Sequence, residues 1–321
     1  MNIVNFSEFT KESLNMIVDN ALIIKKEPKS YSDVCKNRTL YLLFEKTSTR
    51  TAVSFDRAMV ELGGTTLTQK FEDTNFCVGE IRDEVRYIGR NFDIIMARMK
   101  LNDTIREMAQ YSSVPVINGC CNKYHPCQAL ADVMTIKEIF GRYEINMIYI
   151  GVWNNVLNSL IETLPKLGGK LYVLTPIINE SSFDQNIVDK AKDTGNFEIL
   201  DSKMSTEQLK EIVKGMDIVY TDTWVDLEFF NNQKYADVKN ERISMMMPYQ
   251  VNRELLDGSK AIVMHDMPMH SGYEISRETI EDNIDTILLQ AENRRHIEKG
   301  VLIEVDSVAK QRFEELRKNN A

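Results

Sequence analysis

One short segment carries side chains suited to binding a phosphate-like anion: Ser48, Thr49, Arg50 and Thr51. It lies between an apolar stretch, residues 39–44, and a helical pattern. Hydroxyl residues at a helix start cap free N–H groups, which accounts for Ser48 or Thr49 alone. An arginine in the first turn opposes the helix dipole by up to ~1 kcal/mol, and a bound anion would reverse that effect. The segment therefore favours anion binding over simple capping.

Other side chains suited to chemistry also follow apolar segments. They are Arg98, His125, Gln128, Asn154, Asn155 and Asp222. Taken singly, each has a structural interpretation, since loop histidines commonly bond to the backbone and asparagine pairs form turns and helix caps. Ligands of parallel α/β sheets bind beyond the carboxyl ends of the strands, so a site is nevertheless expected at such positions.

The elements that must position these residues alternate between short apolar strands and helical patterns. Buried strands are expected at residues 39–44, 92–97, 114–117, 145–150, 171–175, 217–221 and 260–264. From about Ser276 onward the pattern is that of two helices. This alternation predicts a doubly wound α/β architecture with two parallel sheets, one on each side of residues 135–144.

The composition is that of an ordinary globular chain. Of the 321 residues, 43% are hydrophobic and 27% are charged, and the net charge is −9. Such an acidic chain is not expected to bind nucleic acid or anionic membranes, and no apolar run reaches the ~20 residues of a membrane span. The five cysteines have neither a metal-binding nor a disulfide spacing, and the first residues lack a secretion signal. We therefore expect a cytoplasmic protein.

Taken together and in order, the motifs resemble those of the aspartate and ornithine carbamoyltransferase family over nearly the whole chain. Residues 44–51 are similar to its Ser-Thr-Arg-Thr carbamoyl-phosphate signature, and residues 125–128 to its His-Pro-x-Gln segment. Further segments resemble the ornithine branch: residues 151–159, 220–225, 249–252 and 291–296. The order of these segments makes the resemblance more specific than any single motif.

The resemblance implies two doubly wound parallel-sheet domains with the active site in the cleft between them. The carbamoyl-phosphate-binding domain is expected to comprise residues 1–138 and the C-terminal helix, about 290–321. The amine-acceptor-binding domain is expected to comprise residues 139–289. The implied reaction is attack of a primary amine on the carbonyl carbon of carbamoyl phosphate with release of phosphate, and it needs no metal and no cofactor.

The resemblance also names the residues expected to bind the donor. The carbamoyl-phosphate ligands are Ser48, Thr49, Arg50, Thr51, Arg98, His125, Gln128, Met267 and Arg294. Negative charge builds on the carbonyl oxygen during the attack, so fixed hydrogen-bond donors are needed there. The residues expected to act in catalysis are Arg50, Arg98, His125, Gln128, Asp266 and Arg294.

The arginines that the resemblance places around His125, and the helical pattern around Arg294, each add an expectation. Positive surroundings should lower the pKa of His125 and keep it a neutral donor. Helical periodicity alone would place Arg294 on an exposed helix face, whereas the resemblance directs it to the carbamoyl group.

For the amine acceptor, the expected ligands are Asn154, Asn155, Asp222, Asp226, Leu227 and Asp266. The resemblance implies that Asp222 binds the α-amine of the acceptor. It implies that Asn155, together with Asn154, binds the carboxylate of the acceptor.

Two segments depart from the ornithine branch, and both bring carboxylates. Asp226-Leu227-Glu228 stands where the branch has Ser-Met-Gly, and His265-Asp266-Met267-Pro268 stands where it has His-Cys-Leu-Pro. Carboxylates attract cations and repel the carboxylate of an amino acid. Either Asp226 and Glu228 face solvent and ornithine is the acceptor, or the acceptor carries a second amine or guanidinium, as putrescine and agmatine do. In the second case Asp266 would orient the attacking ammonium and help to deprotonate it.

The sequence thus predicts a carbamoyltransferase acting on ornithine or a related amino acid or diamine. A non-catalytic or regulatory protein of the same fold that senses a small anionic metabolite is the alternative, because fold alone does not establish activity. A dinucleotide-dependent oxidoreductase is disfavoured, since residues 151–154 lack the later glycines of a pyrophosphate-binding turn. The expected partners are carbamoyl phosphate, a small amine and identical subunits, in a homotrimer or a multiple of it.

Overall fold

The computed structural model describes residues 1–225, 227–230 and 232–320. The chain forms two compact units. Unit 1 comprises Met1–Met134 and Glu292–Ala321, and unit 2 comprises Thr135–Ala291. Two helices cross the boundaries between these ranges, α5 (Pro126–Phe140) and α12 (Ile284–Val305).

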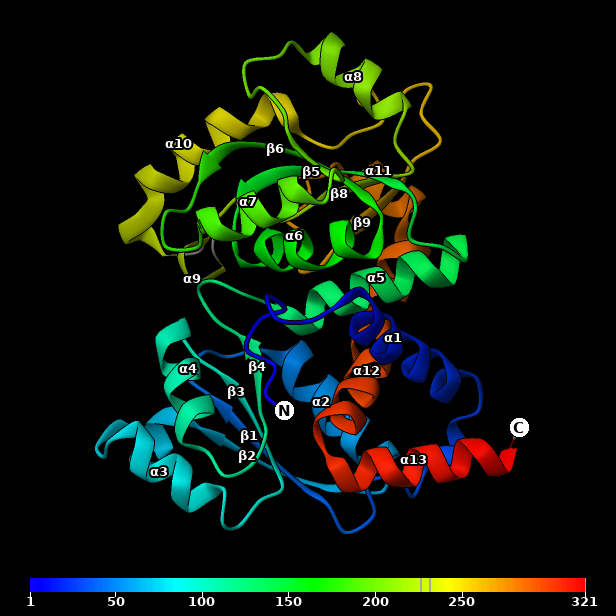
Figure 1. The fold of residues 1–321 in the computed structure, drawn as a ribbon. Helices are drawn as coiled ribbons and strands as arrows, with labels where there is room; N and C mark the ends of the chain where they lie inside the picture. The colour runs from blue at the N-terminus through cyan, green and yellow to red at the C-terminus, as the bar shows by residue number, and fades with distance from the viewer. Residues whose placement is uncertain (226, 231, 321) are drawn as a thin grey trace. The chain divides into compact units, whose positions relative to one another are not determined.

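Unit 1 is built on a four-stranded parallel sheet with the strand order β2-β1-β3-β4. The strands are β1 (Thr39–Phe44), β2 (Thr65–Lys70), β3 (Ile94–Arg98) and β4 (Val116–Cys120). The two central strands are apolar and almost wholly buried, as expected for strands that are covered on both faces. Figure 1 shows α3 (Ile81–Ile88) and α4 (Asn102–Tyr111) on one side of the sheet and α2 (Thr49–Glu61) and α12 on the other.

The other helices of unit 1 precede, connect or follow the strands. They are α1 (Lys11–Lys26), the 3-10 turn η1 (Pro28–Tyr31), α2 (Thr49–Glu61), the 3-10 turns η2 (Phe71–Asp73) and η3 (Asn75–Cys77), α3 (Ile81–Ile88), α4 (Asn102–Tyr111) and α13 (Ser307–Asn320). Helix α2 forms where Ser48 caps the N-terminus and where Phe55, Ala58 and Met59 recur on one buried face. Its start is thereby fixed directly after strand β1.

Unit 2 has a five-stranded parallel sheet with the order β7-β6-β5-β8-β9. The strands are β5 (Asn146–Trp153), β6 (Lys170–Ile178), β7 (Phe197–Ile199), β8 (Ile218–Thr221) and β9 (Ile262–His265). The helices are α6 (Asn155–Leu167), α7 (Gln185–Asp193), α8 (Thr206–Lys214), α9 (Leu227–Phe230), α10 (Ala236–Met246) and α11 (Arg277–Asp282), with the 3-10 turns η4 (Gln233–Tyr235) and η5 (Met247–Tyr249).

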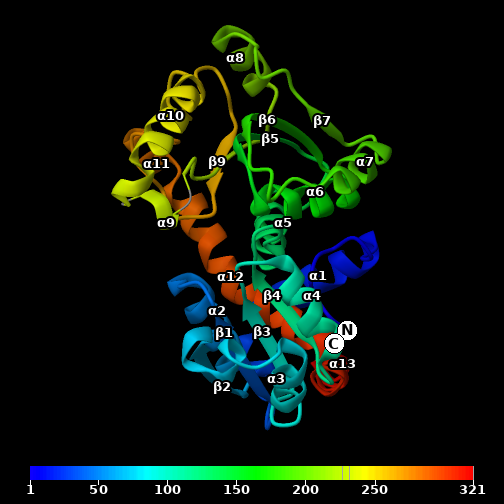
Figure 2. The same cartoon turned by 90° about the vertical axis from the view of Figure 1, so that its left-hand side faces the viewer.

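Helices cover both faces of the unit 2 sheet. Leu209 of α8 and Ile280 of α11 join the buried cluster that contains Ile148 and Ile150 of β5. Figure 2 shows α6 and α7 on the opposite side of the strands from α10 and α11. The prediction of two doubly wound α/β units is therefore confirmed.

Three elements differ from the expectation. Strand β2 was not expected, because it is polar and largely exposed at the sheet edge. Strand β7 is also an edge strand, and it has only three residues. The chain after Ser276 contains three helices instead of two, because Asn283 leaves the helical conformation and bonds through its side chain to the backbone of Val263.

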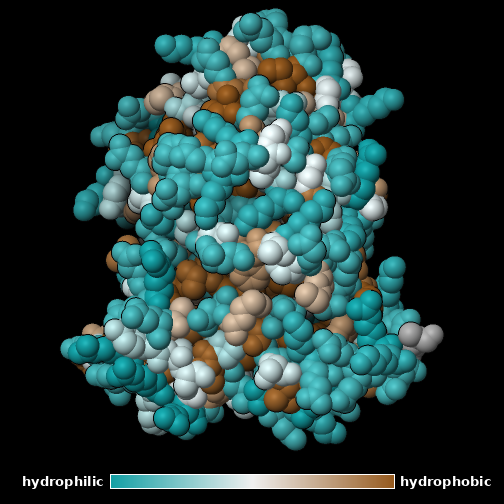
Figure 3. Space-filling view, viewed as in Figure 1, coloured by the Kyte–Doolittle hydropathy of each residue, from teal (hydrophilic) through white to brown (hydrophobic). Residues whose placement is uncertain are grey.

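Figure 3 shows a face on which hydrophilic side chains predominate and hydrophobic ones occur in small groups. Among the described residues, no helix combines the length and the apolar character that crossing a membrane requires.

Candidate active site

Three neighbouring strands of unit 1 end next to the residues expected to bind the donor. Strands β1, β3 and β4 are parallel neighbours, so their carboxyl ends meet at one edge of the sheet. The segment 45–51 follows β1, Arg98 is the last residue of β3, and His125 follows β4. Helix α12, which comes from the far end of the chain, contributes Arg294 to the same unit.

The segment after β1 is held in the conformation of a capped helix start. Ser48 has extended backbone angles, and its Oγ accepts from the N–H of Thr51 at 3.3 Å and donates to the Thr51 hydroxyl at 3.0 Å. Thr49 and Arg50 open helix α2, with Thr49 exposed and Arg50 half-buried. The first turn of α2 therefore presents N–H groups, a hydroxyl and a guanidinium together.

Thr51 connects two arginines that are far apart in the sequence. Its buried Oγ1 accepts from Nη1 of Arg98 at 3.3 Å and from Nη2 of Arg294 at 3.5 Å. Like charges gathered in this way repel each other, and a bound anion would relieve that repulsion. The arrangement is thus suited to a small ligand of negative charge.

His125 is buried beside the same cations. Burial holds the pKa of His125 well below its usual range. The positive charges of Arg294, Arg98 and Arg50 lower the pKa further, by smaller amounts. The expected direction is confirmed, although desolvation contributes more than the positive charges that the sequence suggested. His125 is neutral near pH 7 and can donate a hydrogen bond without adding charge.

Gln128 and Arg294 form a fixed pair. Arg294 Nη1 donates to Gln128 Oε1 at 2.8 Å, and Gln128 Nε2 donates to Asp132 Oδ1 at 2.9 Å. Only 3% of Arg294 is exposed, so its placement on an exposed helix face, which periodicity alone would give, is wrong. The physical reason is that the Arg294 guanidinium donates to buried acceptors, Thr51 Oγ1 on α2 and Gln128 Oε1 on α5.

Unit 2 brings two of the expected acceptor ligands into direct contact. Asn154 caps helix α6 through its Oδ1, which accepts from the N–H groups of Val156 and Leu157. Its Nδ2 donates to Oδ2 of Asp222, which is buried just after strand β8. The cap and the contact with Asp222 are therefore made by the same side chain. Asn155 is the first residue of α6.

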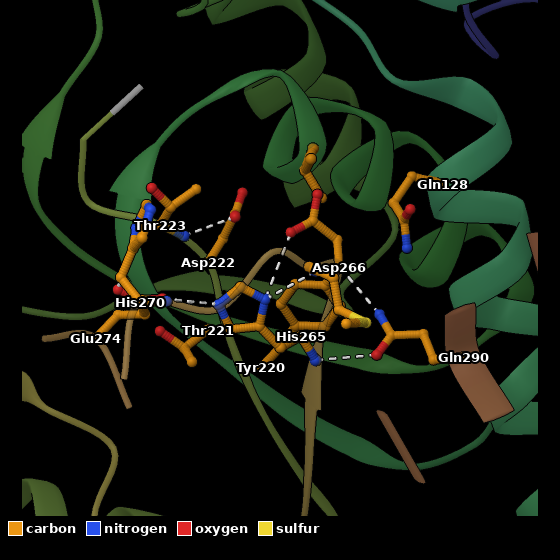
Figure 4. Close-up of polar contacts among 12 residues, drawn as sticks. Gln128, Tyr220, Thr221, Asp222, Thr223, His265, Asp266, His270, Glu274 and Gln290 are labelled. Atoms are coloured by element: carbon orange, nitrogen blue, oxygen red, sulfur yellow. Dashed lines mark hydrogen bonds and ion pairs between the residues drawn. The ribbon is translucent and has the colours of Figure 1, made fainter. Parts of the chain in front are cut away.

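Asp266 lies beside a buried histidine at the end of β9 (Figure 4). Nδ1 of His265 accepts from the N–H of Met267 at 2.9 Å, which places the ring proton on Nε2. That nitrogen lies 3.1 Å from Oε1 of the buried Glu274. Asp266 Oδ1 lies 3.6 Å from His265 Nδ1. Because that nitrogen already accepts from the Met267 N–H, the carboxylate lies beside the ring without a hydrogen bond to Nδ1.

The other expected ligands are placed as follows. Met267 has a left-handed backbone with φ of 61° and precedes Pro268 through a cis peptide bond. Leu227 begins helix α9. Asp226 lies outside the described residues.

Asp222, His265 and Asp266 form a compact cluster. Their side-chain ligand atoms lie within 4.8 Å of one another. The residue types and the spacing would allow a metal ion, but both ring nitrogens of His265 already have partners. One cationic group, such as a substrate ammonium, could reach both carboxylates at this spacing.

Three contributing residues were missed by sequence reasoning. Asp132 fixes Gln128, Glu274 bonds His265, and Glu298 accepts from Arg294. The first and the last could have been found, because each stands four residues after its partner on an expected helix. Glu274 had no such signal, because its contact with His265 is made across a loop.

Two successive ranges of the chain match the two domain models of one enzyme family. Residues 1–138 match the model "Aspartate/ornithine carbamoyltransferase, carbamoyl-P binding domain". Residues 143–305 match the model "Aspartate/ornithine carbamoyltransferase, Asp/Orn binding domain".

Curated relatives and solved structures agree with this match. The ornithine carbamoyltransferase of Methanocaldococcus jannaschii is 36% identical over 307 residues, which cover 94% of this chain and 97% of the relative. That of Archaeoglobus fulgidus is also 36% identical, over 313 residues that cover 95% and 97%. The structure of the Pyrococcus furiosus ornithine carbamoyltransferase superimposes with a TM-score of 0.84 at 34% identity, covering 95% of this chain and 96% of that chain.

The fold and the matched domains define an α/β carbamoyltransferase. The chain belongs to the aspartate/ornithine carbamoyltransferase family, and it is an enzyme similar to the ornithine carbamoyltransferases.

Proposed function

We propose that this enzyme transfers the carbamoyl group of carbamoyl phosphate to a primary amine, either ornithine or a related amino acid or diamine. The observation that carries this proposal is the cation cluster of unit 1. Arg98 and Arg294 both donate to the hydroxyl of Thr51, the residue that follows Arg50, and the charges of all three arginines lower the pKa of the buried His125.

The phosphate of the donor is assigned to the start of helix α2. Ser48, Thr49 and Thr51 supply hydroxyls and backbone N–H groups, and Arg50 supplies a guanidinium for charge-assisted bonds. Arg98, which donates to the Thr51 hydroxyl, adds a second positive charge, and the family resemblance assigns it to the carbonyl oxygen of the donor.

The carbonyl oxygen of the donor is assigned to His125 and Arg294, with Gln128 and Met267 also lining the carbamoyl group. The amine nitrogen attacks the carbonyl carbon, a C–N bond forms, and the bond from carbon to the phosphate oxygen breaks. Negative charge that develops on the carbonyl oxygen is stabilised by donors that are already fixed in place. The bond from Arg294 to Gln128 provides such fixation.

The acceptor is assigned to the carboxylate cluster of unit 2. Asp222 would hold one ammonium group, while Asp266 would orient the attacking nitrogen and receive its proton. Asn154, Asn155, Asp226 and Leu227 are assigned to the rest of the acceptor. Two carboxylates this close together favour a cationic acceptor, such as the amino groups that ornithine and putrescine carry.

The test is an assay of carbamoyl transfer from labelled carbamoyl phosphate across a panel of ornithine, putrescine and agmatine. We expect a carbamoylated product with at least one of these amines and release of an equal amount of phosphate. Binding of carbamoyl phosphate without turnover on any amine would contradict the proposal and favour a sensor of anionic metabolites.

We also propose that the enzyme assembles from identical subunits, as a homotrimer or a multiple of it. Large apolar side chains on unit 1 are exposed in the single chain, among them Val53, Val78 and Tyr87. Val78 is 82% exposed, and covering such side chains in an assembly would remove apolar surface from water. Light scattering coupled to size-exclusion chromatography would contradict this assembly if it gave the mass of one chain.

A further inference from the structure

Glu298 is a buried carboxylate that no motif accounts for. It lies on helix α12, four residues after Arg294, and its side chain is 0% exposed. Its Oε1 accepts from Nη2 of Arg294 at 3.1 Å. A negative charge in the interior is costly, so its presence beside a proposed donor ligand calls for a function.

The contact with Glu298 completes a set of acceptors around the Arg294 guanidinium. Nη1 is bonded to Gln128, and Nη2 faces both Glu298 and the hydroxyl of Thr51. These acceptors come from α5, α12 and α2. A planar guanidinium held at both terminal nitrogens keeps one orientation before the substrate arrives.

We propose that Glu298 is a positioning residue of the donor site, which fixes the Arg294 guanidinium and couples the binding of an anion to the uptake of a proton. This inference rests on the proposed function, because it takes Arg294 as a ligand of carbamoyl phosphate. It adds a residue that acts through Arg294 without touching the reacting atoms.

The surroundings of Glu298 explain the coupling. Burial raises the pKa of Glu298 to about 7, while Arg294 and the Ser54 hydroxyl of α2 act in the opposite direction. From α5 the titratable group is the Cys127 thiol, whose pKa is raised chiefly by burial and also by Glu298, so it stays uncharged. Of Glu298, Arg294 and Cys127, Glu298 is thus the group that titrates near neutral pH.

The sign of the effect follows from the charges. Below about pH 7 Glu298 is neutral, and the charge of Arg294 acts fully on an anion. At higher pH the carboxylate offsets that charge, so binding weakens. An anion that binds near Arg294 makes ionisation of Glu298 less favourable, and the site therefore takes up a proton on binding.

The first experiment compares pH profiles of kcat/KM for carbamoyl phosphate in the wild type and in Glu298→Gln. Dividing one profile by the other cancels the ionisation of the amine, which both enzymes share. We expect the wild type to lose about fivefold relative to the variant between about pH 6 and about pH 8.5. The matched control is Glu304→Gln on the same helix, where the glutamate pairs with Lys310. Its profile should follow the wild type.

The second experiment measures binding of sulfate, which stays doubly charged over this pH range, by calorimetry in buffers of different ionisation enthalpy. We expect proton uptake in the wild type near pH 7.5 and none in Glu298→Gln. A ratio of profiles that does not change with pH, or sulfate binding without proton uptake in the wild type, would overturn the coupling. Absence of sulfate binding by the wild type would overturn it as well.

A third variant isolates the fixation of Arg294. Glu298→Leu removes the acceptor as well as the charge, whereas Glu298→Gln keeps an oxygen for Arg294. We expect kcat to fall more in Glu298→Leu than in Glu298→Gln at about pH 6, with folding checked by circular dichroism. Equal kcat in both variants would overturn the positioning role. Failure of the proposed function is recognised separately, as lack of transfer by the wild type to every amine.

Discussion

Nη1 of Arg294 donates to Oε1 of Gln128 at 2.8 Å, although the two residues are 166 positions apart in the chain. Gln128 lies in the first turn of α5, directly after the loop that carries His125, and Arg294 lies on α12. The bond therefore connects the C-terminal part of unit 1 to the strand-end loops of its sheet. The expected donor site of unit 1 is incomplete without residues from the last tenth of the chain.

Replacement of Arg50 by alanine should weaken the binding of carbamoyl phosphate about 10- to 100-fold, because a charge-assisted contact worth about 1.5–3 kcal/mol is lost. The measurement is the Kd of carbamoyl phosphate, or its KM at saturating amine. Arg57→Ala is the matched control, since Arg57 lies on the same helix and pairs with Glu61. Equal affinity in wild type and Arg50→Ala would contradict the assignment of the helix α2 start to phosphate.

Stability should depend on pH through Glu298. Its pKa is raised by burial from 4.5 to about 7, so the unfolded state loses the proton at lower pH than the folded state. Native stability that depends on this group is therefore lost as the pH rises from about 4.5 to about 7. Glu298→Gln should be more stable than the wild type by about 2–3 kcal/mol near pH 8, and the difference should shrink toward pH 5.

Urea unfolding at several pH values measures this difference. Glu304 also lies on α12, and its carboxylate is paired with Lys310. Glu304→Gln therefore provides the reference for a charge removed elsewhere on the same helix. A stability difference between wild type and Glu298→Gln that stays constant with pH would contradict the raised pKa.

The central strands could be predicted from the sequence because burial on both faces leaves a continuous apolar run. Strand β1 spans the residues that were expected, Thr39–Phe44. An exposed edge strand lacks that signal, because polar residues are tolerated where nothing covers the strand. Strand β2, with the sequence TTLTQK, was missed for this reason.

The expected site residues were identifiable because parallel strands bring their carboxyl ends together, and polar residues after several strands must then be neighbours. Arg98 and Thr51 meet in this way. What the sequence did not indicate is which buried groups hold these residues. The partners of Arg294 and of His265 depend on the packing of α12 and on a loop, and neither follows from periodicity.

Replacement of Asp266 by cysteine should shift the preference of the enzyme toward ornithine. Asp266 is one of two carboxylates in a cluster whose side-chain atoms lie within 4.8 Å, and it would repel the α-carboxylate of an amino acid. We expect the ratio of kcat/KM for ornithine over putrescine to rise about tenfold. Asp257→Asn, at an exposed position of the same unit, is the control. An unchanged ratio would mean that Asp266 does not face the acceptor.

Glu274 should matter for the acceptor half of the reaction, because it fixes the tautomer of His265. The His265 ring accepts from the Met267 N–H at Nδ1, so the proton stands on Nε2 and points to Glu274 at 3.1 Å. Glu274 also accepts from the backbone N–H of His270, which closes the loop that follows β9. Loss of the carboxylate frees the ring and with it the segment that carries Asp266.

We therefore expect Glu274→Leu, which removes the acceptor as well as the charge, to lower kcat about 10- to 100-fold while the KM for carbamoyl phosphate stays the same, since partners that orient a functional group commonly have effects of this size. Nitrogen-15 NMR of the His265 ring reports the tautomer directly, and it should show a mixture in the variant. Glu281→Gln, which removes an exposed carboxylate paired with Arg277 on α11, is the control. A variant that keeps both the wild-type kcat and a single Nε2-protonated ring would show that Glu274 only fills space, because a residue that merely packs has no means of moving the proton between the two nitrogens.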